Sequence, residues 1–474
     1  MDIYNFTQEK TTNKAITDLI QKDSISSNKA FMATSERYYN SQNDISNKDF
    51  RKYVANGTEK INYNRSNQRI SHNFFKLLVN QAVNYITGNA ISYKHIDKQF
   101  QEYLDKFLMF VFDDMCVEWL KEARKKGRGY LHFYYDLDGK LNFAVIPAEQ
   151  IIPIYKDSFK KELDEVVRYY SVPGVEGGKE VVKKRVEVWT STDVSYYSET
   201  ADGDFVLSDQ MSHWSYTIDT IPDYVEPMAW GRVPFIELRN NIEGTSDLLD
   251  IKQHIDAYDL IQSEFINQIA DVREILIKVL GYSGTDVEEI MKIFRSTGIV
   301  KIDDATGNID VLKTEIPVEA REKALDRLKQ NIFVIGQGVD STNERFGTTS
   351  SGIALKMLYA PLDLKCSATI RKMMKSLYEF MWFITEDYNR KFGKSINYLD
   401  INFTFSKNMM INEAEIIESL VKSKGLISDE TITEKHPYVD DPILETERLL
   451  KQSEKELEQF NQQVMQNRDQ TNLE

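Results

Sequence analysis

The sequence has 474 residues, 41% of them hydrophobic and 11% aromatic, so it is too apolar for a disordered chain and long enough for two to four domains. Lys and Arg number 59 against 74 Asp and Glu, which gives a net charge of −15. Such an acidic chain is not suited to gripping nucleic acid through counterion release, although a duplex could pass it without sticking.

The termini and the cysteines place further bounds on the class of protein. The first residues, MDIYNFTQEKTTNK, lack the basic region and apolar core of a signal peptide, and no apolar run approaches the ~18 residues of a membrane span. Cys116 and Cys366 are too few for a disulfide scaffold, so both are predicted to be reduced, buried thiols in helices. We therefore expect a chain that is intracellular when it is made.

The first part of the chain reads as polar sequence followed by two helices. Residues 1–65 are rich in Asn and Ser and show only short helical patches. Helical spacing of apolar residues then predicts a helix over 66–85, with a stop at Gly88. A second helix is predicted over 97–126, ending at Gly127.

Strand patterns follow as far as about residue 210. RGYLHFYY and KLNFAVIP flank a predicted hairpin turn, DLDG, at 136–139. EVVRYYSV, KRVEVWTSTDVSYYS and DFVLSD continue the series with short turns between them. Neighbouring strands joined by short turns predict an antiparallel sheet.

Two long helices enclose a small insertion in the next part of the chain. Apolar residues step by three or four through 246–275, which predicts a helix on the order of 40 Å long. Several acidic residues lie largely off this stripe. The insertion, 276–316, combines β-like runs with a short helix predicted over 286–296. A further helix is predicted from Pro317 to Gly336.

A polar loop and a very long helix come next. Residues 339–351 are polar and show no apolar periodicity, whereas an apolar stripe then continues to Tyr388. Pro361 lies inside this stripe, so we expect a kink just before it. A strand is predicted at 398–406, and helices resume at Asn412. Among these, Ser428 is a predicted helix cap, Pro442 a predicted helix start, and the C-terminal tail is polar.

Short motifs do not identify an enzyme. FGKS at 392–395 resembles the end of a phosphate-binding loop, but the position that requires glycine is Tyr388 and the preceding segment is helical. The six histidines are scattered and none pairs with another His or Cys at zinc spacing. We therefore expect no catalytic residues, no metal and no cofactor.

The order of the elements is more informative than any motif. It resembles that of portal proteins of long-tailed phages of Gram-positive bacteria, and several stretches are similar to that family's sequences. These stretches are NRSNQRISHNFFKLLVNQAVNYITGNAISY (64–93), GRVPFIELRNNIEGTSDLLDIKQHIDAYDLIQSEFINQIADV (231–272), TSSGIALKMLYAPLDLK (349–365) and GLISDETITEKHPYVDDPILETERL (425–449). The resemblance covers most of the chain, although no single motif is diagnostic.

The resemblance implies a mainly helical α+β portal fold that assembles as a closed ring, typically a dodecamer. Its regions map onto this chain as a wing (1–240), stem helices (246–275 and 317–336), a clip (276–316), a channel loop (337–351), a kinked long helix returning to the wing (352–410, the wing part being 366–410), and a crown with a polar tail (411–474).

The resemblance also implies a function without catalysis. Portal rings sit at one capsid vertex of the virion, after assembly in the host cytoplasm, and double-stranded DNA is packaged and ejected through them without sequence-specific contacts. The expected partners are further copies of the chain, the terminase large subunit, a head–tail connector or adaptor, and the major capsid and scaffolding proteins, with no membrane involved. Two alternatives stay open: a packaging enzyme, which would need a phosphate loop or acidic metal cluster, and a scaffold or minor capsid protein without a channel.

Three groups of residues are candidates for the portal's contacts. DNA-channel loop candidates are Ser341, Thr342, Asn343, Arg345, Thr348 and Thr349, channel-facing acidic stem candidates are Asp250, Asp256 and Asp259, and clip docking candidates are Asp303 and Asp304. The arginine could meet phosphate, while the loop's small polar side chains could make sequence-independent contacts. The competing interpretations are a solvated connection for the loop, an ordinary helix surface for the stem acids, and a turn cap for the clip pair.

Overall fold

The chain's structure, a computed structural model, describes residues 13–63, 65–136, 138–176, 179–200, 202–217, 225–271, 276–280, 308–312, 317–342, 352–407, 413–439 and 442–471. Two compact units divide the chain: Met1–Gly338 with Leu364–Lys407, and Val339–Asp363 with Asn408–Glu474. The described helices are α1 (Asn13–Ser24), α2 (Ser27–Tyr39), η1 (Asp44–Asn47), α3 (Phe74–Thr87), α4 (Lys98–Leu108), α5 (Phe112–Lys126), η2 (Ala148–Gln150), α6 (Leu248–Asp271), α8 (Val318–Ile335), α9 (Gly352–Phe392), η4 (Tyr398–Asp400), α10 (Glu413–Lys422), α11 (Asp429–Lys435) and α12 (Pro442–Thr471).

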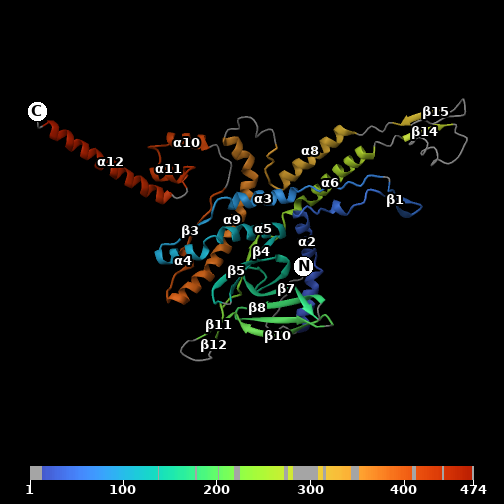
Figure 1. Cartoon of the computed structure of the whole chain (residues 1–474), viewed down its shortest axis with the longest axis horizontal. Helices are drawn as coiled ribbons and strands as arrows, with labels where there is room; N and C mark the ends of the chain where they lie inside the picture. Colours follow the sequence, from blue (N-terminus) through green and yellow to red (C-terminus); the bar gives the residue numbers. More distant parts are fainter. Residues whose placement is uncertain are drawn as a thin grey trace. The chain divides into compact units, whose positions relative to one another are not determined.

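The strands form small antiparallel sheets (Figure 1). The five-stranded sheet has the order β10-β9-β8-β7-β6 and a three-stranded sheet the order β13-β4-β5, so the predicted meander and the mixed α+β class are confirmed. The described strands are β1 (Lys52–Ala55), β2 (Thr58–Ile61), β3 (Ser92–Lys94), β4 (Arg128–Tyr135), β5 (Leu141–Ile146), β6 (Ile151–Tyr155), β7 (Leu163–Glu176), β8 (Lys179–Trp189), β9 (Asp193–Glu199), β10 (Phe205–Ser212), β11 (Trp214–Thr217), β12 (Val225–Met228), β13 (Phe235–Arg239), β14 (Leu276–Leu280), β15 (Asn308–Leu312) and β16 (Asn402–Thr404).

Helix α1 covers the five-stranded sheet through one apolar face. Ile16, Leu19 and Ile20 recur at helical spacing and share a buried cluster with Val167 and Val186 of the sheet. The two valines face the same side because β7 and β8 pair in register and side chains alternate along each strand. Burying each of these side chains contributes about 1.5–3 kcal/mol, so the polar-looking N-terminal region still holds a firmly packed helix.

Helix α9 packs against the three-stranded sheet through aromatic rings. Phe383 stacks on Phe133 of β4 with ring centroids 4.6 Å apart, and Phe380 meets Phe143 of β5 edge to face at 5.1 Å. Such ring pairs add about 0.5–1.5 kcal/mol each beyond the burial of their area. The C-terminal half of α9 is therefore fixed to the sheet that β4 and β5 form.

Helix α5 ends where the sequence predicts, and the reason is steric. Gly127 has φ +87°, and a Cβ added there would lie 2.3 Å from the carbonyl oxygen of Gly244. Only glycine adopts this conformation at such a close approach without strain. The same helix buries Cys116 completely, and Cys366 of α9 is also a buried free thiol, as predicted. Burial raises the pKa of the Cys116 thiol.

The single helix predicted over 97–126 is wrong, because the chain forms α4 and α5 with a break between them. Phe110, in the break, has φ +67°, a left-handed conformation that no residue adopts inside an α-helix. Each helix buries its own apolar face: Leu104 and Leu108 of α4 are as deeply buried as Trp119 of α5. Apolar spacing continued across the break, so the sequence pattern did not reveal it.

The second unit contains α10, α11 and α12. Ser428 caps α11 by accepting a hydrogen bond from the backbone N–H of Thr431 at 3.3 Å, and α12 begins at Pro442, so both predicted helix starts are confirmed. No helix in the described part of the chain is long and apolar enough to cross a lipid bilayer.

Candidate functional site

The candidate site is built on α6 and α8, which pack along one another and lead toward the hairpin of β14 and β15 (Figure 1). Ile251 and Ile255 of α6 and Ile332 of α8 are almost fully buried. Farther along the pair, the Arg321 guanidinium lies 5.6 Å from the ring centroid of Phe265. The apolar stripe of each helix therefore forms the contact, which leaves other faces of α6 for polar interactions.

A polar ladder occupies a second face of α6, with one side chain every fourth residue. The ladder accepts hydrogen bonds from alternate backbone N–H groups of the arm, residues 66–73, at 2.6–3.0 Å. Four helical residues rise about 6 Å and two extended residues about 6.6 Å, so the two spacings match. The rungs are Ser66 to Asp271, Gln68 to Asn267, Ile70 to Ser263 and His72 to Asp259.

The polar ladder corrects the prediction that a helix begins at Ser66. In the structure the arm is extended and α3 begins only at Phe74. The arm's N–H groups find acceptors on α6, so an extended conformation leaves them satisfied. The Asn267 amide also donates to the Gln68 carbonyl at 2.9 Å, which closes that rung in both directions.

Asp259 is the most enclosed member of the polar ladder. Its side chain is 0% exposed, and its carboxylate accepts from the His72 backbone N–H at 3.0 Å and the Asn43 amide at 2.6 Å. The His72 ring Nδ1 lies 2.7 Å away. A carboxylate enclosed in this way does not face solvent, so the expectation that Asp259 lies on an exposed acidic face is wrong. Asp259 lies off the apolar stripe of α6 because it faces the buried donors of the arm, not because it faces solvent.

The other two acidic candidates on α6 keep more contact with solvent. Asp250 is exposed. Asp256 is 34% exposed and is held by Lys252 at 2.8 Å and by the Tyr38 hydroxyl. Burial and the hydrogen bond to Asp256 raise the pKa of Tyr38, so this phenol stays protonated. The charge of Asp256 is thus partly balanced by Lys252, and that of Asp250 is fully presented to solvent.

A buried joint ties the base of the helix pair to α5 and α9. Asp247, just before α6, accepts from Arg124 Nη1 at 3.0 Å and lies 2.9 Å from Lys365 Nζ. Lys365 also donates to the carbonyl of Gly336, at the end of α8, at 3.0 Å. Arg124 donates in addition to Thr369 Oγ1 at 2.9 Å. The start of α6 and the end of α8 therefore meet at one lysine, and the two helices run in opposite directions.

The joint's electrostatics favour the charged form of Asp247. Burial alone would raise the pKa of this carboxyl group, but the charges of Lys365 and Arg124 outweigh that effect and lower the pKa to about 2. The sequence gives one weak signal for the joint, namely an arginine within the apolar pattern of α5. Nothing in the sequence placed Lys365 or Asp247 beside it, because the three come together only through tertiary packing.

Among the residues that the structure describes, no three His, Cys, Asp or Glu side chains gather as ligands for a metal ion. The arrangement consists instead of paired helices, an anchored base and a distal hairpin. A family model described as "Phage portal protein, SPP1 Gp6-like" matches residues 24–459, which is most of the chain.

The chain belongs to this phage portal protein family. The portal protein of Bacillus phage SPP1 is 32% identical over 452 residues, covering 94% of this chain and 87% of the relative. The portal protein of Clostridium phage phiCD119 is 31% identical over 443 residues, covering 88% of this chain and 91% of the relative. These matches confirm the resemblance found in the sequence, to a family whose named members are portal proteins.

The structure describes the beginning of the portal's polar loop. Thr342 donates from its backbone N–H and its hydroxyl to Asp340, at 3.0 and 2.7 Å, so Ser341 and Thr342 lie in a tight polar turn. The other loop candidates, Asn343, Arg345, Thr348 and Thr349, lie outside the described residues.

The structure does not test two further expectations for the portal fold. Asp303 and Asp304 lie outside the described residues, as does the helix predicted over 286–296. Pro361 lies inside α9, which is helical from Gly352 to Phe392. The kink before Pro361 stays a prediction.

Proposed function

We propose that this chain is the subunit of the ring-shaped channel at the portal vertex of a tailed phage, and that double-stranded DNA is packaged and ejected through the ring. The observation that carries this proposal is the family match over residues 24–459. The ring is a closed assembly of about twelve head-to-tail copies, and each copy offers two different faces to its neighbours. It is a component of the virion, assembled in the host cytoplasm.

In this proposal α6 and α8 are the stem helices and the β14–β15 hairpin belongs to the clip. The joint anchors both helices at the end away from that hairpin, which supports a rigid stem with a docking element at its tip. The clip docks the terminase large subunit during packaging and a head–tail connector afterwards. Residues 1–240 and 366–410 form the wing, which meets the major capsid and scaffolding proteins, and 411–474 form the crown.

The channel acts on DNA through repulsion and weak contact. Each copy carries a net charge of −15, and Asp250 presents an unbalanced carboxylate on the stem helix α6. A duplex in a negatively charged passage is repelled from the wall and does not lodge there. Residues 337–351 form the channel loop, whose polar side chains touch the phosphate backbone without reading sequence.

Electron microscopy of the purified protein tests the assembly directly. We expect rings with a central hole, and no ATP hydrolysis above that of a buffer control. Particles without a hole would favour the scaffold or minor capsid protein. ATP turnover that co-purifies with the chain would instead favour a packaging enzyme.

A further inference from the structure

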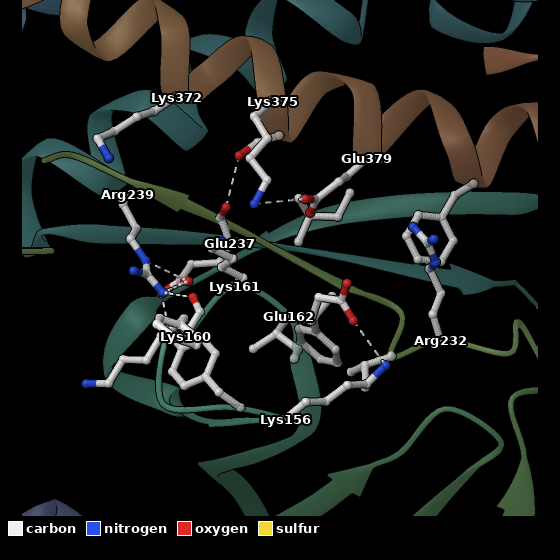
Figure 2. A pocket seen from close by; sticks show the side chains of 18 of the residues that line it. Lys156, Lys160, Lys161, Glu162, Arg232, Glu237, Arg239, Lys372, Lys375 and Glu379 are labelled. Atoms are coloured by element: carbon white, nitrogen blue, oxygen red, sulfur yellow. Dashed lines mark hydrogen bonds and ion pairs between the residues drawn. The ribbon is translucent and has the colours of Figure 1, made fainter. Parts of the chain in front are cut away.

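A basic pocket lies between the β6–β7 hairpin, the turn before β13 and the middle of α9 (Figure 2). It is open to solvent and has a volume of about 490 Å³. Seven basic side chains line it against three carboxylates, although the whole chain carries a net charge of −15. The basic residues are Lys156, Lys160, Lys161, Arg232, Arg239, Lys372 and Lys375.

The first of the pocket's carboxylates, Glu237, already accepts hydrogen bonds on both of its oxygens. Glu237 accepts from Arg128 Nη1 at 3.1 Å, from the Tyr155 hydroxyl at 2.8 Å and from Arg239 Nε at 2.9 Å. These contacts occupy both carboxylate oxygens. Glu237 therefore organises the pocket floor, where it pairs with Arg239, and in the described chain it forms no ion pair with the pocket's lysines.

The other two carboxylates are each paired with a neighbouring lysine. Glu162 lies 3.3 Å from Lys156, and Glu379 lies 3.6 Å from Lys375, one helical turn away on α9. Burial raises the pKa of Glu379 despite the nearby positive charge, so its negative charge is disfavoured inside the pocket. The pocket's own acids thus leave part of its positive charge uncompensated.

Four cations of the pocket remain. Arg232 lies over the Trp382 ring, 3.8 Å from its centroid. The other three are lysines: Lys160 and Lys161 on the β6–β7 hairpin and Lys372 on α9 (Figure 2). In the described chain none of their ammonium groups has an ion pair with a carboxylate. The hairpin is held in place because the Lys160 carbonyl accepts from Arg239 at 2.7 Å. The Lys161 ammonium lies 5.6 Å from the ring centroid of Phe159. The three cations therefore belong to a preformed concave surface.

The shape of the pocket favours a peptide over a duplex. A volume of about 490 Å³ lies within the range of sites that enclose small ligands. Duplex DNA is a thick convex rod, with a major groove about 12 Å wide, so its phosphates would touch the rim and leave the floor empty. An Asp or Glu side chain on a protruding segment can enter the pocket and meet the ammonium groups.

We infer that the basic pocket receives a carboxylate-bearing segment of a neighbouring copy of this chain. The inference rests on the ring assembly proposed above. Copies that each carry −15 repel one another, so their interface needs local patches of opposite charge. A head-to-tail ring places the pocket of one copy against a different face of the next, and that face is drawn from an acidic chain.

Zero-length cross-linking identifies the occupant. Isotopically heavy and light protein would be mixed before assembly, treated with a carbodiimide that joins amines to carboxyl groups, digested and analysed by mass spectrometry. We expect heavy–light cross-links from Lys160, Lys161 or Lys372. Assembled protein in which these lysines give only links within one chain would overturn the inference. So would protection of the three lysines from acetylation by added duplex DNA without mixed links, which would point to nucleic acid.

Charge reversal at the three lysines tests whether the pocket contributes to association between copies. The triple change Lys160→Glu, Lys161→Glu and Lys372→Glu should weaken association at least 10-fold in sedimentation velocity, and less so in 0.5 M salt than in 0.05 M salt. The control reverses three exposed lysines outside the pocket by the same total charge and should assemble as the wild type does. The control residues are Lys98, Lys106 and Lys140.

Circular dichroism establishes that both triple variants are folded, and Lys→Gln substitutions at the same three pocket positions give a milder series. Folded pocket variants that form rings as readily as the control would overturn this inference and leave the proposed function standing. Wild-type protein that forms no ring at any concentration would overturn the proposed function as well.

Discussion

Replacing Asp247 with Asn should destabilise the first unit more than any other single carboxylate change on or next to α6. Asp247 accepts from Arg124, Lys365 and the Asn240 amide, at 3.0, 2.9 and 2.7 Å. Arg124 is 0% exposed. The substitution keeps the size of the side chain but leaves two cations, one of them fully buried, without a negative partner.

The size of the effect follows from the pKa of Asp247. Its value of about 2, against an ordinary 3.8, means that the folded state favours the carboxylate by ~2.4 kcal/mol. Breaking a buried pair from one side costs about 3–5 kcal/mol. We therefore expect a loss of about 2–4 kcal/mol at pH 7. Because the folded pKa is the lower one, this stabilisation is complete above about pH 4 and is lost as the pH falls toward 2.

Urea unfolding at pH 7 and at pH 3 measures this loss. Asp250→Asn is the matched control, since Asp250 is an exposed carboxylate only three residues farther along the chain, where substitution changes stability by about 0.5 kcal/mol or less. The gap between wild type and Asp247→Asn should narrow at pH 3. If the two substitutions cost the same at pH 7, the joint does not stabilise the fold in the way that its geometry indicates.

Four other changes test separate parts of the molecule. Gly127→Ala should cost about 2–4 kcal/mol in thermal unfolding, because its Cβ would meet a carbonyl oxygen at 2.3 Å; an unchanged melting temperature would contradict the close approach. Asp259→Ala should speed amide exchange in the arm, since its donors lose their acceptor; unaltered protection would show that the polar ladder does not hold the arm. Shortening the loop within 341–350 should spare rings but reduce nuclease-protected DNA per capsid, and full packaging would restore the solvated-connection interpretation. Reversing Asp303 and Asp304 should weaken terminase or connector binding to intact rings, and unchanged binding would remove both from the docking face.

The sequence predicted best those elements whose pattern is local. The helices on either side of the β14–β15 hairpin follow from an apolar stripe that buries Ile251, Ile255 and Ile332. Strand runs separated by turn residues predicted the antiparallel sheet, and Gly127 predicted the end of α5. In each case the residues that determine the element lie within it, so periodicity and turn chemistry are sufficient.

Elements that depend on distant partners were missed. Ser66 was predicted to begin a helix because its own segment shows helical spacing, whereas the arm is held extended by acceptors 187 to 205 residues away on α6. Asp259 was assigned to an acidic surface for the same reason: the sequence shows its charge but not the Asn43 and His72 donors that surround it. The basic pocket also escaped notice, because its lysines come from segments far apart in the chain.

The anchoring of α6 and α8 at one end makes the helix pair a lever. Both helices meet α9 at Lys365, and the polar ladder joins the arm to α6 as far as Asp271. The β14–β15 hairpin follows the other ends of the pair in the chain. The 24 residues of α6 span ~36 Å. A tilt of about 5° at the joint would therefore carry the far end of the pair by ~3 Å, enough to break or remake hydrogen bonds there. Small adjustments around the partly exposed Lys365 would thus be converted into larger displacements at the hairpin, which is where we propose that partner proteins dock.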